Sequence, residues 1–310
     1  FFWKNFFKKN KVAAVLPSHD CYIHYNIVIK IAQKNNVPVY MASMYNFQKS
    51  TYDHSLYKER FINYKNFFNR LSSIEKNEAK KIAKAQIISR LSGKVGVNIH
   101  YSEKSAYNKK QDENINDRII KDSNKIKILI CTHCFFDNPH GYGGSMFIDF
   151  YEWLIFLCNI SEKTNYDWYI KPHPDYLPGT IETINEITNN YPNIKLIHPN
   201  VSFHKLIDEG LQYVLTCHGS VGHELAYLDI PVINSGYNPH INYDFNIHPS
   251  NIDEYKKILM NLSGLKININ KEEIYEFYYI HYYYTKIDNL FLNSLIDMHV
   301  DKIKGHKVYD

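Results

Sequence analysis

Histidines stand beside proline, glycine and hydroxyl residues in three stretches of the second half of the chain. The stretches read THCFFDNPHGYGGS over 132–145, KPHPD over 171–175 and CHGSVGHE over 217–224. Each follows a short apolar run that predicts a buried strand. Because ligands bind at the carboxyl edge of parallel α/β sheets, we expect the three stretches to line one crevice. A phosphate or a sugar hydroxyl is the ligand that this crevice is expected to bind.

The pattern over 211–235 predicts a strand, a tight turn, a short helix and a second strand. His218 and Gly219 lie in the turn, where backbone N–H groups and the helix dipole favour an anion. Ser220 is expected to cap the helix or to bind a phosphate oxygen. Glu224, one turn later, is expected to face the same mouth.

His173 lies between two prolines, which would hold it rigidly at the end of a strand. With Lys171 it could neutralise a pyrophosphate during its departure, and Pro174 completes the motif. The alternative is a histidine that caps the next helix or hydrogen-bonds within its own loop. We favour the phosphate-binding interpretation.

The stretch 132–145 contains three glycines, among them Gly143, which let the backbone approach a ligand closely. His133 adds a ring nitrogen at the start of this stretch. Asp137 and His140 could either contact the ligand or support the loop itself. Both interpretations stay open.

Cys131 and Cys134 enclose a threonine and a histidine, a spacing that invites a zinc or redox interpretation. A four-ligand zinc site needs a second Cys/His pair, and Cys131 should point into the core from its strand. We therefore expect both thiols to serve packing and predict no metal site.

In the first half, His19 and Asp20 follow the predicted strand 12–16. A histidine at a strand edge could take the proton from a hydroxyl nucleophile, with the carboxylate orienting its ring. The alternative is a buried histidine that satisfies a loop carbonyl. The catalytic interpretation makes His19 the base and Asp20 its support.

Alternating strands and helices predict an α/β fold with parallel sheets. In the second half the strands are expected at 126–131, 167–171, 194–197, 213–215 and 231–233, and the helices at 146–160, 180–189, 202–208, 252–262 and 272–281. In the first half a helix is expected at 1–10, a strand at 12–16, a helix at 22–31, a strand at 37–42 and helical structure over 55–92. The polar stretch 109–125 lacks apolar periodicity and is interpreted as a linker, which predicts domains 1–122 and 123–310.

The composition excludes several classes of protein. A net charge of +4, from 36 basic and 32 acidic residues, does not indicate nucleic-acid binding. Five cysteines in 310 residues suggest a reducing, cytoplasmic compartment. No apolar run is long enough to span a bilayer, and no signal peptide is visible. Phe1 is not a start methionine, so we expect the numbering to begin inside a longer protein.

Residues 1–10, FFWKNFFKKN, place lysines between aromatic residues. One interpretation is an amphipathic segment on a membrane surface, here the cytoplasmic face of the inner membrane. The other, which we favour, is a helix that packs into its own domain.

Five motifs together resemble the bacterial capsule and surface-polysaccharide glycosyltransferases of the GT-B architecture, in the circle of Kdo transferases, HP-motif sialyltransferases and CDP-glycerol glycerophosphotransferases. They are SHDCYIHYNI at 18–27, GKVGVNIHYSEKSAY at 93–107, THCFFDNPHGYGG at 132–144, KPHPD at 171–175 and CHGSVGHELAYLDIPVIN at 217–234. The resemblance covers about residues 12 to 245. It implies two facing Rossmann-like domains, with the nucleotide donor in the second and the acceptor nearer the first. It also implies that His173 and Ser220 contact the donor phosphate without a bound metal.

The sequence therefore predicts a metal-independent glycosyltransferase that needs no cofactor. It would move a sugar from a nucleotide donor, CMP-Kdo or another nucleotide sugar, onto a capsule or lipopolysaccharide glycan. The acceptor could be lipid-linked, and the enzyme could belong to a multi-enzyme complex. The alternatives are a CDP-alditol phosphotransferase, a nucleotide-sugar 2-epimerase and a glycan-binding domain without catalysis. The predicted catalytic residues are His19, Asp20 and His173. The predicted donor-binding residues are Lys171, Pro174, His218, Gly219, Ser220, Glu224, His133, Asp137, His140 and Gly143.

Overall fold

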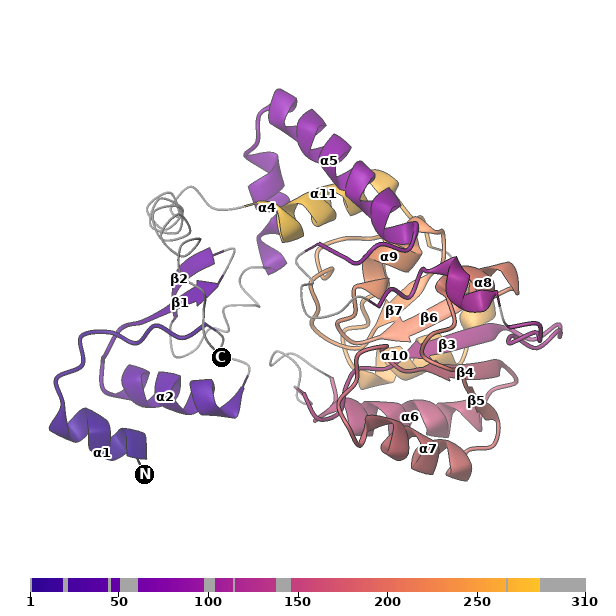
Figure 1. The fold of residues 1–310 in the computed structure, drawn as a ribbon, viewed down its shortest axis with the longest axis horizontal. Coiled ribbons are helices and arrows are strands. Elements are labelled where there is room, and N and C mark those ends of the chain that lie inside the picture. Colours follow the sequence, from indigo (N-terminus) through magenta and orange to yellow (C-terminus); the bar gives the residue numbers. More distant parts are fainter. Residues whose placement is uncertain are drawn as a thin grey trace. The chain divides into compact units, whose positions relative to one another are not determined.

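The computed structural model describes residues 2–18, 22–43, 46–50, 61–97, 104–113, 115–137, 146–265 and 267–284. The chain forms two compact units, one of residues 1–59 with 282–310 and one of residues 60–281 (Figure 1). The domain boundary predicted at 122/123 falls inside the second unit and stays a prediction, as does the facing arrangement of two domains. No helix in the described ranges is long and apolar enough to cross a membrane.

The first unit contains helices α1 (Phe2–Lys9) and α2 (Ile23–Lys34) and the antiparallel strands β1 (Val39–Ser43) and β2 (Asn46–Ser50). The predicted strand at 12–16 is reduced to a parallel bridge between Val15 and Val39. Because α2 connects the two sides of this bridge, the predicted β-α-β connection is present. Strand β2 was not predicted, since its sequence NFQKS is mostly polar.

Helix α1 confirms the predicted helix at 1–10, but none of its residues is fully buried. Phe7 packs against the small core around Ile29 and Val39. Phe2, by contrast, is 69% exposed. The helix thus contacts its own unit on one side and presents an aromatic residue to solvent on the other.

The second unit contains helices α4 (Tyr64–Asn69) and α5 (Ser73–Leu91), which confirm the helical pattern predicted over 55–92, except for residues 55–60, which lie outside the described ranges. A capping box fixes the start of α5: the Ser72 side chain accepts from the Glu75 amide, and the Glu75 carboxylate accepts from the Ser72 amide. This arrangement satisfies two amides that the first helical turn leaves free. Helix α5 ends at Leu91, next to the sheet domain described below.

The stretch predicted as a linker is held to the rest of the second unit. It contains the short 3₁₀ helix η1 (Lys109–Asp112). The Glu209 carboxylate accepts hydrogen bonds from the amides of Ile119 and Ile120, and Ile120 is fully buried. The few isoleucines in this polar stretch therefore anchor it, although they show no helical or strand periodicity.

Five parallel strands form the sheet of the second unit, in the order β5-β4-β3-β6-β7. They are β3 (Lys127–Cys131), β4 (Asp167–Lys171), β5 (Ile194–Leu196), β6 (Tyr213–Thr216) and β7 (Val232–Asn234). The helices are α6 (Phe150–Ser161), α7 (Thr180–Asn190), α8 (Phe203–Asp208), α9 (Val221–Tyr227), α10 (Ile252–Leu259) and α11 (Lys271–Tyr282), with the 3₁₀ turn η2 (Leu262–Gly264). The predicted α/β class with a parallel sheet is confirmed.

The order of the strands places a switch point beside β3. The chain runs from β3 outward through β4 and β5, and then returns to add β6 and β7 on the other side. The loops after β3 and β6 therefore diverge at the carboxyl edge of the sheet. In open α/β sheets, ligands bind at this point.

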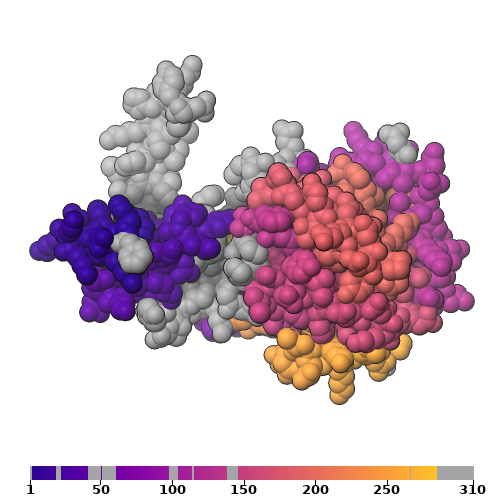
Figure 2. Space-filling model, turned by 90° about the horizontal axis from the view of Figure 1, so that it is seen from below, coloured from indigo at the N-terminus to yellow at the C-terminus, as the bar shows by residue number. Residues whose placement is uncertain are grey.

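The core of this unit lies between the sheet and its helices. One buried cluster joins α6, α7 and α10 to the sheet, and its largest members are Trp153 and Trp168. Leu129 and Val214, which alternate with residues of that cluster along their strands, are buried on the opposite face. Figure 1 shows α6 and α7 on one side of the sheet and α8 and α9 on the other, and Figure 2 shows the outer surface on the α6 and α7 side in magenta to salmon.

Candidate functional site

A pocket of about 270 Å³ lies at the switch point, within the second unit. After β3 it is lined by Cys131, Thr132, His133, Cys134 and Asp137, after β4 by Lys171, Pro172, His173 and Pro174, and after β6 by Thr216, His218, Gly219, Ser220, Val221 and Glu224. Arg90, Ala106, Phe150 and Phe203 complete the wall. The described parts of the three predicted loops thus line one crevice.

This pocket brings together nine of the predicted site residues: His133, Asp137, Lys171, His173, Pro174, His218, Gly219, Ser220 and Glu224. The other four, His19, Asp20, His140 and Gly143, lie outside the described residues. The roles assigned to all thirteen remain predictions.

Lys171 is a buried cation in the pocket wall. Its ammonium nitrogen donates to the carbonyl of Pro199 at 2.6 Å and lies 4.8 Å from the centre of the Phe203 ring. Burial lowers the pKa of Lys171 to about 8. At neutral pH the side chain is therefore mostly charged. Among the described residues, the Pro199 carbonyl is the hydrogen-bond acceptor of its ammonium group, so further donor positions can serve an anionic ligand.

His173 is fixed through one of its two ring nitrogens. Nδ1 lies 3.1 Å from both the amide nitrogen and the carbonyl oxygen of Asp175. When Nδ1 accepts from that amide, Nε2 carries the proton and can donate to a ligand. Desolvation by the surrounding protein lowers the pKa of His173. The alternative role within its own loop is thus fulfilled by Nδ1, and it leaves Nε2 for a ligand.

Two further histidines shape the pocket as neutral groups. Nε2 of His133 accepts from the His218 amide at 3.1 Å, and the His133 ring stacks on Phe150 at 4.6 Å. Burial brings the pKa of His218 to about 4 and holds that of His133 well below its usual value. Both rings are therefore uncharged at neutral pH and can contribute shape and hydrogen bonds, but not charge.

The turn after β6 is tightly packed around Gly219. A Cβ at this position would lie 2.8 Å from Oγ1 of Thr216, which accepts a hydrogen bond from the Gly219 amide. Ser220 follows with helical backbone angles, and its side chain does not cap α9. The capping role is therefore wrong for Ser220, and its exposed hydroxyl is left for a ligand.

Glu224 is buried and already paired. Its Oε1 accepts from Nε of Arg90 at 2.8 Å and its Oε2 from the Tyr107 hydroxyl at 3.1 Å. Burial raises the pKa of Glu224, but the charges of Arg90 and His223 and the hydrogen bonds from Arg90 and Tyr107 outweigh it, so the pKa is lowered. Glu224 is thus a carboxylate at neutral pH.

The sequence interpretation missed Arg90, Tyr107 and Thr132. Arg90 lies on the same face of α5 as the buried Ala83 and Ile87. A charged residue at an apolar position of a helix signals a buried partner, so this residue could have been noticed. Thr132 is buried, and within the described ranges its hydroxyl has no hydrogen-bond partner. No feature of the sequence distinguishes it.

The two cysteines of the loop after β3 differ in their surroundings. Cys131 is buried, and burial raises its pKa to about 12. Sγ of Cys134 lies 3.4 Å from the Thr180 hydroxyl and accepts from the Leu177 amide at the same distance. Among the described residues, no group of three or more His, Cys, Asp or Glu side chains could hold a metal ion.

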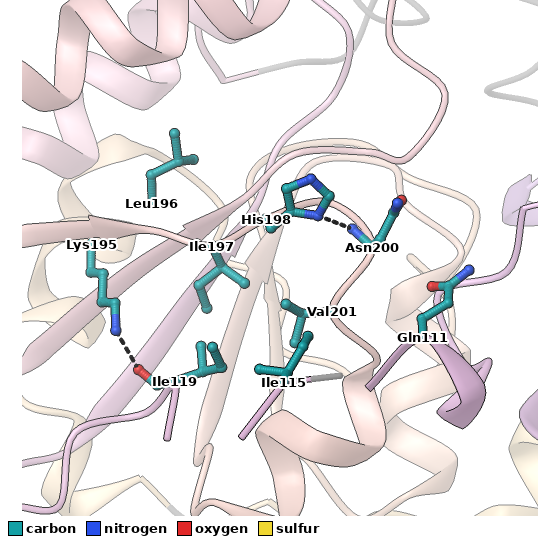
Figure 3. A pocket seen from close by; sticks show the side chains of 9 residues that line it. All are labelled: Gln111, Ile115, Ile119, Lys195, Leu196, Ile197, His198, Asn200 and Val201. Atoms are coloured by element: carbon teal, nitrogen blue, oxygen red, sulfur yellow. Dashed lines mark hydrogen bonds between the residues drawn. The ribbon is translucent and has the colours of Figure 1, made fainter. Parts of the chain in front are cut away.

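A second cavity, of about 530 Å³, follows the edge strand β5 and is lined mainly by apolar side chains (Figure 3). His198 stands at its border, where Nδ1 accepts from the Asn200 amide at 3.2 Å. His173 makes the same kind of bond: in both cases Nδ1 accepts from the backbone amide two residues later. His198, however, is not part of the switch-point pocket.

Comparisons with known proteins give only distant similarity. No protein-family model and no curated protein matches the chain. Among solved structures it is similar to the β-Kdo 2,7 transferase of Thermosulfurimonas dismutans KpsC, with 16% identity and a TM-score of 0.40, covering 72% of this chain and 57% of that one. The β-Kdo 2,4 transferase of the same KpsC gives 11% identity, a TM-score of 0.43 and 86% coverage of both chains. UDP-GlcNAc 2-epimerase from Neisseria meningitidis, bound to UDP-GlcNAc, gives 15% identity and a TM-score of 0.39, covering 95% of this chain and 79% of that one. At these values, the similarity assigns no function to this chain.

Proposed function

We propose that the switch-point pocket binds the phosphate of a nucleotide-activated sugar, and that the chain is a glycosyltransferase acting on a glycan acceptor. The observation that carries the proposal is the convergence of the KPHP loop and the HGS loop on one pocket beside β3. The position is the one where open α/β sheets bind their ligands. The motifs are those on which the resemblance to GT-B glycosyltransferases rests.

The chemistry of the wall suits a phosphate. Lys171 supplies a positive charge, His173 a ring N–H and Ser220 an exposed hydroxyl. When the bond between sugar and phosphate breaks, negative charge develops on the departing phosphate oxygens. Donors that are already in place stabilise this charge without reorganising, which is often the largest contribution to catalysis.

The acceptor hydroxyl must lose its proton as it attacks the sugar. We assign this step to His19, oriented by Asp20, because the sequence pattern predicts them as the base and its support. Glu224 is paired, and Lys171 is mostly protonated at neutral pH. Replacing His19 by Ala should then reduce turnover while donor binding is retained.

A thermal-shift screen of CMP, CDP, UDP, GDP and their sugar conjugates tests the proposal. A ligand that binds the native state raises the melting temperature according to its affinity and concentration. We expect one base to stabilise the protein, and its sugar conjugate to be consumed only when a glycan acceptor is added. Release of free sugar without an acceptor would indicate an isomerase instead. No shift with any of the nucleotides would contradict the proposal.

A further inference from the structure

The buried carboxylate of Glu224 poses an electrostatic problem for an anion-binding pocket. Glu224 lines the same pocket as Lys171 and His173, and its side chain is only 5% exposed. Its charge also acts on His173: burial lowers the pKa of that ring overall, whereas the charge of Glu224 raises it. An unpaired carboxylate here would repel a phosphate, and solvent would screen it little.

The guanidinium of Arg90 compensates the negative charge of Glu224. Its Nε donates to Oε1 of Glu224 at 2.8 Å, and its Nη1 donates to the Lys94 carbonyl at 3.1 Å and to the Ser105 hydroxyl at 3.2 Å. The guanidinium also lies 5.3 Å from the centre of the Tyr107 ring. The Lys94 carbonyl, the Ser105 hydroxyl and the Tyr107 ring therefore hold the Arg90 cation against the Glu224 carboxylate.

We propose that Arg90 is a positioning residue that neutralises Glu224, and that this neutralisation allows the pocket to accept phosphate. The inference rests on the proposed function, because it concerns the anion that the pocket binds. It assigns Arg90 no contact with the ligand. The affinity for an anion should instead follow the summed charge of the Arg90–Glu224 pair.

Inorganic pyrophosphate is the probe, because it carries phosphate charge but no sugar or base. Titration calorimetry at one pH would compare the wild type, Arg90→Met, Glu224→Gln and the double variant. The Arg90–Glu224 pair has a summed charge of zero in the wild type, minus one in Arg90→Met, plus one in Glu224→Gln and zero in the double variant. We expect Arg90→Met to weaken binding by about 10-fold or more, Glu224→Gln to tighten it, and the double variant to return near the wild type.

A different role for Arg90 gives a different result. If its guanidinium bound the phosphate directly, the double variant would be as weak as Arg90→Met. If the pair only supported the fold, Glu224→Gln would not tighten binding. Either result would overturn the inference. Arg90→Met leaves a buried charge unpaired and could fail to fold. Two other variants keep the test decisive in that case: Arg90→Lys should bind pyrophosphate about as well as the wild type, and Glu224→Gln should bind it more tightly.

Arg118 provides the matched control. It lies in the same unit, donates to the carbonyls of Ile120 and Glu209, and is not part of the pocket. Arg118→Met should leave pyrophosphate binding unchanged. A wild type that binds no pyrophosphate would count against the proposed function itself, whereas normal wild-type binding without the charge pattern would count against Arg90 alone.

Discussion

The backbone amide of His218 donates to Nε2 of His133 across 3.1 Å, and this bond ties the loop after β6 to the loop after β3. These are the two loops that diverge at the switch point. The His133 ring is in turn held against Phe150 at the start of α6. The ring of His218 also lies 5.8 Å from the ring of His133 and 6.0 Å from that of Phe150, so several contacts hold the two loops together at the pocket.

Replacing His133 by Phe should keep the stacking on Phe150 but remove the acceptor for the His218 amide. A buried donor without a partner costs about 1–3 kcal/mol. We expect the free energy of unfolding in urea to fall by this amount. His198→Phe is the control, because water can replace the ring nitrogen beside the exposed Asn200 and the change should stay within about 0.5 kcal/mol. Equal effects of both substitutions would argue against the bond to His218.

Stability should fall when the solution is acidified from pH 6.5 towards pH 4. Burial brings the pKa values of His218, His223 and His248 to about 4, compared with 6.5 for a free histidine. In this window the unfolded chain binds protons that the native state excludes, so stability rises with pH, by up to about 1.4 kcal/mol per pH unit for each histidine. Urea unfolding at pH 7 and pH 5 measures this, and His223→Gln should reduce the slope. Equal stability at both values would contradict the burial of these rings.

Anion binding should weaken when the pH rises above about 8. Lys171 has a pKa of about 8 because it is buried, so it loses its charge there, whereas an exposed lysine would keep it. Pyrophosphate affinity measured between pH 7 and pH 9 should fall over this range. Lys171→Met should bind weakly at pH 7 and show no comparable decline. A decline of the same size in this variant would mean that another group titrates.

The sheet and its pocket loops could be predicted because each strand is a short apolar run with a clear break after it. Since parallel strands share one carboxyl edge, the loops with His173 and Ser220 had to lie at that edge. The pairing of Arg90 with Glu224 could not be predicted, because 134 positions separate these residues and nothing local connects them. Strand β2 was missed for another reason: its polar sequence has no apolar strand pattern, and the strand forms by antiparallel pairing with β1.

Gly222 is a position where a methyl group should not fit. A Cβ there would lie 2.5 Å from Cε1 of His240 and 2.8 Å from the side-chain amide of Asn246, and all three residues are buried. Gly222→Ala should therefore destabilise the protein by about 1–3 kcal/mol through overpacking. Gly264→Ala is the control, since its Cβ would meet Asn261 only at 3.7 Å. A neutral Gly222→Ala would show that His240 can move away at little cost.

The most direct measurement compares two histidines in the same local geometry. His173 in the pocket and His198 beside β5 each bond through Nδ1 to their own loop two residues later. The affinity of the best-stabilising nucleotide would be measured for His173→Ala and His198→Ala. We predict that His173→Ala weakens binding by about 10-fold, as expected for the loss of one hydrogen bond to a charged group, and that His198→Ala binds like the wild type. Unchanged affinity in His173→Ala, or equal losses in both variants, would contradict a phosphate site at the switch point.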